Sequence, residues 1–296
     1  MNSDSHMHSS LPVFFLTPCA LIAFAGNSLL CRMALGEGAI DAASFTSLRL
    51  LSGALVLALA LNLSPQKMAV KPQGSVISAV ALFIYAATFS FAYMTLSTGT
   101  GALILFGAVQ GTMILAALLS GERLKGSEGA GVALAFGGLV YLVFPGVTAP
   151  SLQGALLMSV SGISWGIYSL RGRRAVTPLA DTAMNFALTV PCVGVLSLFF
   201  LKNSHVSFYG GLLALLSGGL ASGVGYCVWY AALRGMTATK ASIAQLAVPV
   251  LASTGGVIFL AEKLSLRLII STVIVLGGVG LAVTGCKRVP RVRTPG

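Results

Sequence analysis

Long stretches without a charged residue alternate with short charged segments along the chain. A helix needs about 20 apolar residues to cross the hydrocarbon core of a bilayer. Two uncharged stretches are long enough for two crossings each. The first is divided at residues 97–101 and the second at Phe144-Pro145-Gly146. The pattern predicts ten spans, within residues 5–31, 42–63, 72–121 (two), 129–170 (two), 182–201, 203–233, 241–261 and 268–286.

The same windows predict helices rather than barrel strands, because none of them alternates apolar and polar residues. The composition agrees with a membrane protein: 56% of the 296 residues are hydrophobic and 8% are charged, against about 25% charged residues in soluble domains. The mean hydropathy is +0.93. We therefore expect an all-α polytopic membrane protein. The composition excludes a soluble enzyme, a disordered regulator and a fibrous protein.

Lys and Arg residues fall mainly on one side of the predicted spans. If both termini are cytoplasmic, inside loops hold thirteen of the 18, outside loops hold four, and Arg49 lies within a span. Because cytoplasmic loops of membrane proteins carry an excess of positive residues, we expect both termini inside a bacterial cytoplasmic (inner) membrane. Residues 287–296 form a basic tail on that side, and residues 1–10 are predicted to be disordered. The net charge of +11 is thus a topology signal, and no nucleic acid partner is expected.

Residues for redox, metal or nucleotide chemistry are sparse. The five cysteines include no CxxC pair and are interpreted as small buried residues, and the three histidines form no cluster. No phosphate-binding P-loop is present. We expect no cofactor, no metal and no enzymatic activity.

The two halves of the chain resemble each other at an offset of 140 residues. Glu122-Arg123-Leu124 and Glu262-Lys263-Leu264 end the fourth and ninth spans, and Gly137-Gly138 and Gly277-Gly278 follow at the same offset. Five spans is an odd number, so the second unit enters the membrane from the opposite side. Residues 11–146 and 150–286 are therefore predicted to be two inverted five-helix repeats, an arrangement that serves alternating access in transporters. The alternative is a plain duplication in a structural membrane protein.

These features resemble the EamA-type branch of the drug/metabolite transporter superfamily. Trp165-Gly166 in the sixth span and Pro249 in the ninth also fit that pattern. The chain is most similar to bacterial inner-membrane exporters of aromatic amino acids. The resemblance implies export of amino acids and related metabolites. The first half departs from the pattern, because Ala25 and Val109 stand opposite Trp165 and Pro249.

Arg49 is the one charged residue within a predicted span. Charged groups inside a bilayer usually face a cavity or a partner. Its guanidinium is a candidate for binding a substrate carboxylate. The alternatives are a side chain that extends to the membrane surface, or an ion pair with Asp41 or Glu37.

Other polar and flexible positions within the spans are candidates of the same kind. Amide side chains offer donors and acceptors to a zwitterionic substrate, whereas the plainer interpretation is a hydrogen bond between helices. Pro249 can kink a helix beside a cavity, and a GxxxG spacing is a candidate hinge or a helix contact. The candidates for binding are Gln110 and Gln245, with Asn27 and Asn185 weaker, and the candidates for gating are Pro249, Gly107 and Gly111. Glu122 and Glu262 are expected to cap span ends and to pair with Arg123, Lys263 or Arg267.

Aromatic residues recur at helical spacing in three spans. Such stripes either line a cavity or lie in the interfacial belts where Trp and Tyr are common. Phe89, Trp165 and Trp229 are expected to be deep, whereas Tyr93 and Tyr230 also suit a belt. The predicted cavity-lining residues are Tyr85, Phe89, Trp165, Tyr168, Tyr226 and Trp229.

No carboxylate is central in a predicted span, so we expect a facilitative exporter without a proton relay. Its partners would be small-molecule substrates, namely amino acids, and the lipid bilayer, and we expect a monomer. Alternative cargoes within the same superfamily are purine-like or cationic compounds. An intramembrane enzyme would need a cluster of catalytic groups that the chain lacks, and a channel subunit would more naturally use several identical chains.

Overall fold

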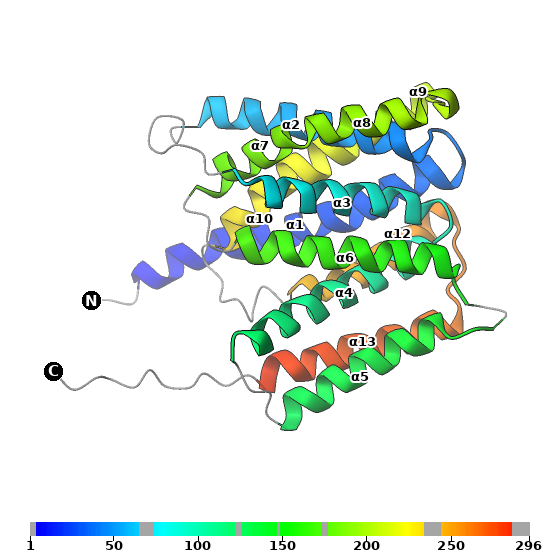
Figure 1. Ribbon diagram of the computed structural model, residues 1–296. Coiled ribbons are helices and arrows are strands. Elements are labelled where there is room, and N and C mark those ends of the chain that lie inside the picture. The colour runs from blue at the N-terminus through cyan, green and yellow to red at the C-terminus, as the bar shows by residue number, and fades with distance from the viewer. Residues whose placement is uncertain are drawn as a thin grey trace.

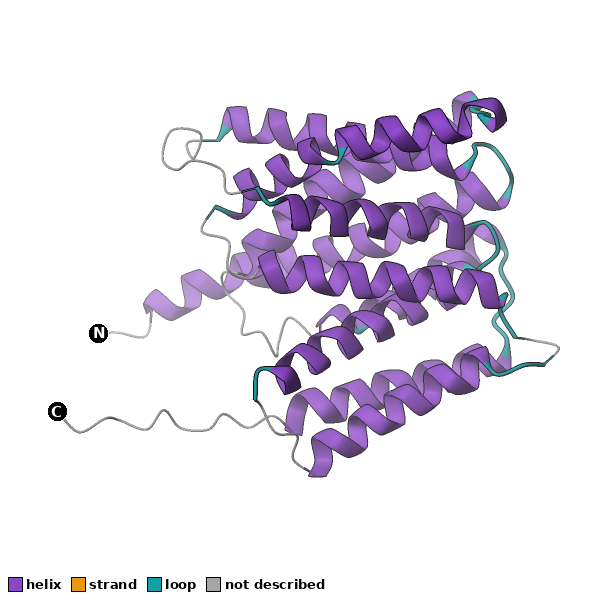
Figure 2. Ribbon diagram, in the orientation of Figure 1, coloured by secondary structure: helices purple, strands orange, loops and turns teal. Residues whose placement is uncertain are grey.

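A computed structural model describes residues 4–64, 74–121, 126–146, 149–172, 177–233 and 244–285. These residues form a bundle of helices, and the described part contains no β-strand beyond an isolated bridge between Ile40 and Val206 (Figure 1, Figure 2). The helices are α1 (Asp4–Gly36), α2 (Ala42–Leu63), α3 (Val76–Tyr93), α4 (Thr98–Leu119), α5 (Gly126–Val143), α6 (Leu152–Gly172), α7 (Pro178–Leu188), α8 (Val190–Phe200), the short η2 (Leu201–Asn203), α9 (Phe208–Leu215), η3 (Leu216–Val224), α10 (Gly225–Leu233), α12 (Ala247–Leu260) and α13 (Leu266–Gly285).

Each predicted span contains a helical rod, and two of the rods are interrupted. Six stretches are long and apolar enough to cross a membrane, namely Phe15–Gly36, Ala42–Leu63, Val76–Tyr93, Thr98–Leu119, Pro178–Asn203 and Phe208–Ala232. Three shorter apolar helices are Gly129–Val143, Ala247–Leu260 and Leu266–Ala282. α6 adds a further 21-residue helix. α1 begins at Asp4 and so extends into the stretch predicted to be disordered.

The outer surface of the bundle is apolar, as lipid contact requires. Large hydrophobic side chains are more than half exposed on several helices, including Leu55, Phe136, Phe199, Phe208 and Ile258. The buried side chains include an unusual number of polar groups, which gather between α1, α2, α3, α4, α6 and η3. An apolar outer surface around a core that also holds polar groups differs from the pattern of a soluble protein and agrees with a multi-pass membrane protein.

The interruptions lie where the sequence weakens a continuous α-helix. The seventh predicted span breaks at Thr189, and Pro191 sits in the first turn of α8, where a missing backbone N–H is tolerated. The eighth continues from α9 through a nine-residue π-helix, η3, into α10. α12 begins after Leu246 and ends at Ala261, whose φ of 50° is left-handed.

Glycines allow close approach of two helix pairs. α5 packs along α13, and a Cβ on Gly278 would lie 2.5 Å from the backbone N of Ala135, whereas a Cβ on neighbouring Gly277 would meet nothing within 4 Å. A Cβ on Gly218 of η3 would collide with the backbone carbonyl of Arg49 in α2. Small residues at such crossings are typical of membrane helices.

Asp41 fixes one end of the bundle. Its carboxylate caps α2 by accepting from the Ser44 N–H at 2.9 Å, and it also accepts from the His205 N–H at 2.9 Å. Partial burial raises the pKa of the Asp41 carboxyl, but these hydrogen bonds outweigh it and hold the pKa below its ordinary value. Asp41 therefore joins the α1–α2 turn to the segment before α9 and does not pair with Arg49.

The cysteines are only in part the buried residues that were predicted. Cys31 is fully buried, but Cys19 is exposed, and Cys192 and Cys227 are partly covered. The exposed thiol reflects the apolar surroundings of a membrane helix, in which a small apolar residue is tolerated on the lipid side as well as in the core. No group of metal-ligating side chains is present within the described ranges. Glu122, Arg123 and Cys286 lie outside them.

Candidate functional site

A cluster of aromatic rings fills the middle of the bundle, and Trp165 of α6 is at its centre. The ring centroid of Trp165 lies 4.9 Å from Tyr85, 5.0 Å from Tyr226 and 5.5 Å from Tyr168, which it stacks upon at 29°. Phe89 adds a contact of 5.5 Å to Tyr85. Contacts in this range are favourable beyond the apolar area that they bury. Helices α3, α6 and α10 thus bring the predicted aromatic stripes together.

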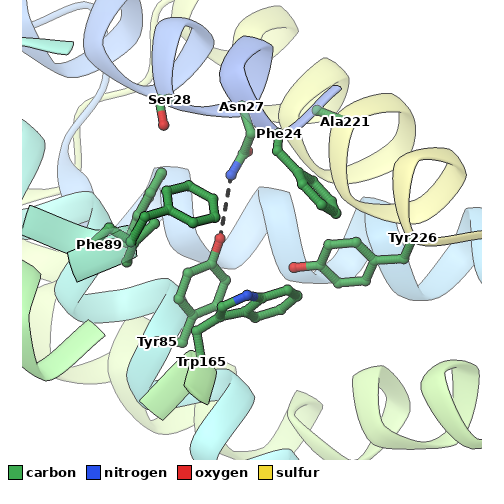
Figure 3. A pocket seen from close by; sticks show the side chains of 10 residues that line it. Phe24, Asn27, Ser28, Tyr85, Phe89, Trp165, Ala221 and Tyr226 are labelled. Atoms are coloured by element: carbon green, nitrogen blue, oxygen red, sulfur yellow. Dashed lines mark hydrogen bonds between the residues drawn. The ribbon is translucent and has the colours of Figure 1, made fainter. Parts of the chain in front are cut away.

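A small cavity lies within this cluster (Figure 3). Its volume is about 20 Å³, which is room for roughly one water molecule. The lining residues are Phe24, Asn27, Ser28, Tyr85, Phe89, Leu105, Phe106, Trp165, Ala221 and Tyr226. We call this the central cavity. The central cavity is therefore too small to hold a metabolite in this structure.

Arg49 lies directly behind the central cavity and is 1% exposed. Its Nη2 donates to the Tyr85 Oη at 2.9 Å, and its Nε donates to the Ser222 Oγ at 3.4 Å. The guanidinium carbon lies 4.8 Å from the Phe89 ring centroid and 5.1 Å from that of Tyr85. Such cation–π contacts stabilise a desolvated cation in part. The side chain therefore does not extend to the membrane surface.

The charge of Arg49 has no counter-ion among the described residues. The described salt bridge joins Arg32 and Glu262, and no described carboxylate lies within 4.0 Å of Arg49. Its Nη1 is buried and makes no hydrogen bond. An unpaired cation in an apolar interior is strongly unfavourable. The Arg49 Nη1 is therefore left with an unused hydrogen-bond donor in the interior of the bundle.

Two serines and an asparagine extend the polar network around Arg49. Ser217 donates to the Asn27 Oδ1 at 2.6 Å, and the Asn27 Nδ2 donates to the Tyr85 Oη at 3.5 Å. Ser217 and Ser222 both come from the π-helix η3. π-helical segments occur frequently at functional sites. Polar groups from α1, α2, α3 and η3 therefore converge on one side of the central cavity.

The other predicted residues lie around this cluster. Trp229 is 6% exposed and reaches it through Phe24, whose ring centroid is 5.6 Å away. Gln110 is 3% exposed with an unpartnered Nε2, and Gln245 is 8% exposed. Neither glutamine lines the central cavity. Their burial fits a place in the protein interior but assigns them no contact with cargo.

The predicted gating positions are placed as follows. α4 is continuous from Thr98 to Leu119, with no break at Gly107 or Gly111. A Cβ on Gly107 would lie 2.8 Å from the Leu139 side chain, so this glycine serves a helix contact, while Gly111 faces open space. Pro249 is buried in the first turn of α12, directly after the break at Leu246.

Tyr93 and Asn185 are both buried within the bundle. Tyr93 is fully buried, its ring lies 4.8 Å from Phe89, and its Oη donates to the Thr98 carbonyl at 3.2 Å. The belt interpretation for Tyr93 was therefore wrong, because the short turn between α3 and α4 folds the ring inward. Asn185 accepts from the Ser75 N–H at 2.9 Å.

Sequence reasoning missed several lining residues. Phe24, Ser28, Leu105, Phe106 and Ala221 were not singled out, although all line the central cavity. Phe24 lies one position before Ala25, the counterpart of Trp165, and this offset is the one signal that pointed to it. Apolar residues in a uniformly apolar span carry no periodic signal, so their orientation follows only from helix packing.

One end of the bundle is closed by contacts between the two halves. The Glu262 carboxylate accepts from the Thr98 N–H at 2.9 and 3.0 Å and from the Thr98 Oγ1 at 3.2 Å, at the first residue of α4. Arg32 lies 3.5 Å from it and donates to the Tyr93 carbonyl at 2.9 Å. We call this set the Glu262 latch.

The latch corrects the expected partners of Glu262. Sequence proximity suggested Arg123, Lys263 or Arg267, but the described ion pair is with Arg32 of α1. Arg267 instead donates to the Phe144 carbonyl. The left-handed residue Ala261 directs Glu262 back across the bundle, which explains why neighbours in the sequence are not its partners.

The opposite end is open. A cavity of about 490 Å³ lies between the first turn of α3, the last turns of α4 and α6, and α7. Its lining residues are Ser75, Ser78, Ala116, Ser120, Tyr168, Leu170, Arg171, Gly172, Asp181 and Asn185. We call this the inner cavity. The start of α1 and the end of α13 are at this same end of the bundle, and the loop between α5 and α6 is at the other (Figure 1).

Comparisons with known proteins agree with this architecture. The family model of EamA-like transporters matches residues 152–284. An uncharacterized protein of Pseudomonas aeruginosa is 53% identical over 90% of this chain and 92% of its own length. An uncharacterized transporter of Archaeoglobus fulgidus is 27% identical over 95% of this chain and 98% of its own length.

A more distant comparison extends to a solved structure. One crystal structure aligns with a TM-score of 0.62 over 90% of this chain and 98% of that chain, at 20% identity, which shows a shared fold. Together with the helical bundle and its apolar surface, these similarities establish the class of protein. Residues 152–284 match the EamA-like transporter family, and this match together with the relatives named transporters supports a multi-pass membrane transporter of the drug/metabolite transporter superfamily.

Proposed function

We propose that this transporter exports aromatic and other apolar amino acids, and related small metabolites, from the bacterial cytoplasm by facilitative alternating access. The observation that carries the proposal is the buried, unpaired guanidinium of Arg49 against an aromatic cavity. A substrate carboxylate would neutralise Arg49, and the rings of Tyr85, Phe89 and Trp165 would cover its apolar side chain. A buried cation disfavours cationic cargo by like-charge repulsion.

Helix packing supports an inverted repeat as the basis of alternating access. In the predicted repeat, α1, α3 and α4 of the first half correspond to α6, α10 and α12 of the second half. The contact between α3 and α6 therefore corresponds to the contact between α10 and α1, and the contact between α4 and α6 corresponds to the contact between α12 and α1. Three further contacts each join a helix to its own counterpart in the other half, namely α5 with α13, α4 with α12 and α2 with α7. Two equivalent sets of contacts would allow either end of the bundle to open in turn.

The two ends of the bundle support an inward-open state. The Glu262 latch closes the end that the charge distribution places outside, and the inner cavity opens at the end that it places inside. The latch joins residues from both halves, as a gate requires. One chain encloses the central cavity, so we propose a monomer as the working unit.

The described acidic side chains support transport without a proton relay. Glu37, Asp41, Asp181 and Glu262 lie at or next to helix ends, and none of these four lines the central cavity. We propose that cargo moves down its own gradient. Counterflow of labelled phenylalanine in proteoliposomes without an ion gradient tests this directly. Transport that appears only with an imposed proton gradient would refute it.

Arg49→Met tests the role of the buried guanidinium. We expect loss of phenylalanine counterflow together with unchanged or raised thermal stability, because an apolar side chain removes the unfavourable buried charge. Arg49→Lys keeps the charge but loses the planar fork, so we expect partial activity. Arg267→Met, which removes a partly buried cation beside Phe144 and away from the central cavity, is the control and should retain transport. Full counterflow by Arg49→Met would overturn the proposed role.

A further inference from the structure

The inner cavity differs in chemistry from the central cavity. Its volume of about 490 Å³ is within the range of about 300–1,000 Å³ that holds small molecules. The central cavity, at about 20 Å³, admits no metabolite in this conformation. Cargo that approaches the inward-open protein therefore meets the inner cavity first. Polar side chains of α3, α6 and α7 form much of its wall.

Side chains of opposite charge lie in this wall. Arg171, in the last turn of α6, donates from its Nε to the Ser78 Oγ at 3.0 Å and from its Nη2 to the Ser75 Oγ at 2.9 Å. Both serines belong to the start of α3, so the guanidinium is held in place at the cavity. Asp181, in the first turn of α7, is 7% exposed and accepts from the Thr177 Oγ1 at 3.2 Å.

Tyr168 connects the inner cavity to the central one. Its side chain lines the inner cavity, and its ring stacks on Trp165, which lines the central cavity. The residue is 2% exposed. Its Oη lies near Thr182 and Asn185 but makes no hydrogen bond of good geometry. A buried phenol without a well-placed partner is unusual and provides a donor or acceptor for a ligand.

We propose that the inner cavity is a loading site for zwitterions. Arg171 binds the carboxylate of the cargo, Asp181 binds its ammonium group, and the Tyr168 Oη donates a hydrogen bond to the carboxylate. This inference rests on the proposed transport of amino acids. The carboxylate then passes from Arg171 to Arg49 when the stacked pair of Tyr168 and Trp165 moves apart. Because the two charges lie in one wall, the site selects for cargo that carries both.

The test compares three aromatic probes that differ only in charged groups. Labelled phenylalanine is bound at equilibrium to the full chain in lipid nanodiscs, and 3-phenylpropanoate, without the ammonium, and 2-phenylethylamine, without the carboxylate, are used as competitors. We expect Asp181→Asn to weaken phenylalanine binding by about tenfold, the loss of one charge-assisted contact, and to leave competition by 3-phenylpropanoate unchanged. We expect Arg171→Gln to weaken the binding of both phenylalanine and 3-phenylpropanoate.

Two further variants separate recognition from structure. Asp181→Glu keeps the carboxylate and should restore most of the phenylalanine affinity, which a loss of folding would not permit. Glu37→Gln removes an exposed acid at the other end and should leave all three affinities unchanged. The proposal is overturned if Asp181→Asn weakens the binding of phenylalanine and of 3-phenylpropanoate equally, or if it weakens the binding of neither compound.

The outcomes also distinguish this site from the proposed function. If the wild-type chain neither binds nor transports phenylalanine, the proposed function fails. If the wild type transports phenylalanine and Arg49→Met abolishes transport, but Asp181→Asn and Arg171→Gln leave the KM unchanged, then only the loading site is refuted. A raised KM with unchanged kcat in both variants supports it, because loading precedes the movement across the membrane.

Discussion

Glu262→Gln is expected to open the end of the transporter that the Glu262 latch closes, which the proposed orientation places outside. The Glu262 latch joins α12 to the first turn of α4 and to α1, so it holds the two halves together at one end. The substitution keeps one oxygen as an acceptor for the Thr98 N–H but removes the negative charge. Each conformation of an alternating-access transporter is stabilised by contacts that the other lacks. In the proposed alternating-access cycle, loss of the charge therefore shifts the population toward the state in which the latched end is open.

The size of the shift follows from the contacts that depend on the charge. A carboxylate at a helix N-terminus gains about 0.3–1 kcal/mol from the helix dipole. A partly exposed ion pair adds about 0.2–1 kcal/mol, and the Arg32 and Glu262 side chains are 26% and 15% exposed. With part of the charge-assisted hydrogen bonding also lost, we expect a total of about 2 kcal/mol, or about a thirtyfold change in the conformational equilibrium.

Thiol accessibility measures this equilibrium. Ser28 is 1% exposed and lines the central cavity, so a Ser28→Cys reporter in a background without native cysteines is shielded from outside while the latch is closed. Glu262→Gln should raise its labelling rate by a membrane-impermeant maleimide added outside intact cells. Glu37→Gln, an exposed acid at the same end, is the matched control. An unchanged or lower rate with Glu262→Gln, or an equal rise with Glu37→Gln, would refute the latch.

Two further predictions concern stability. Gly278→Ala should lower the melting temperature of the purified protein, because overpacking against the backbone of α5 costs about 1–3 kcal/mol. Gly277→Ala is the control, because its added Cβ meets free space and should leave the melting temperature unchanged. Equal effects of the two substitutions would contradict the close approach of α13 to α5. Asp41→Asn should destabilise the protein at pH 7, because the lowered pKa of Asp41 means that its charged form stabilises the fold above the ordinary pKa of about 3.9. That contribution is lost as the pH falls through the lowered pKa, so the stability difference between wild type and variant should shrink as the pH falls below the ordinary value. A stability difference that is independent of pH would contradict this assignment.

Much of the architecture was readable from the sequence because each membrane helix satisfies its own backbone hydrogen bonds. The length of each apolar window therefore predicted where helices lie, and each of the ten predicted spans contains a helix. The burial of Phe89, Trp165 and Trp229 was also predicted correctly, since large aromatic residues at helical spacing mark one face of a helix. The break at Thr189 and the π-helix η3 were not predicted, because a uniformly apolar stretch contains no periodic signal of local geometry.

The contacts of the candidate site were decided by the tertiary structure. The sequence identified Arg49 as a costly charge within a span but left its partners open among Asp41, Glu37 and a substrate. The partners of Arg49 depend on how α2, α3 and η3 are rotated about their own axes. The close contact of Gly218 with the Arg49 backbone fixes how α2 and η3 face each other. Glu262 likewise pairs with a residue 230 positions away rather than with its neighbours. Hydropathy acts along the chain and determines the spans, whereas side-chain packing between rods determines which buried polar groups meet.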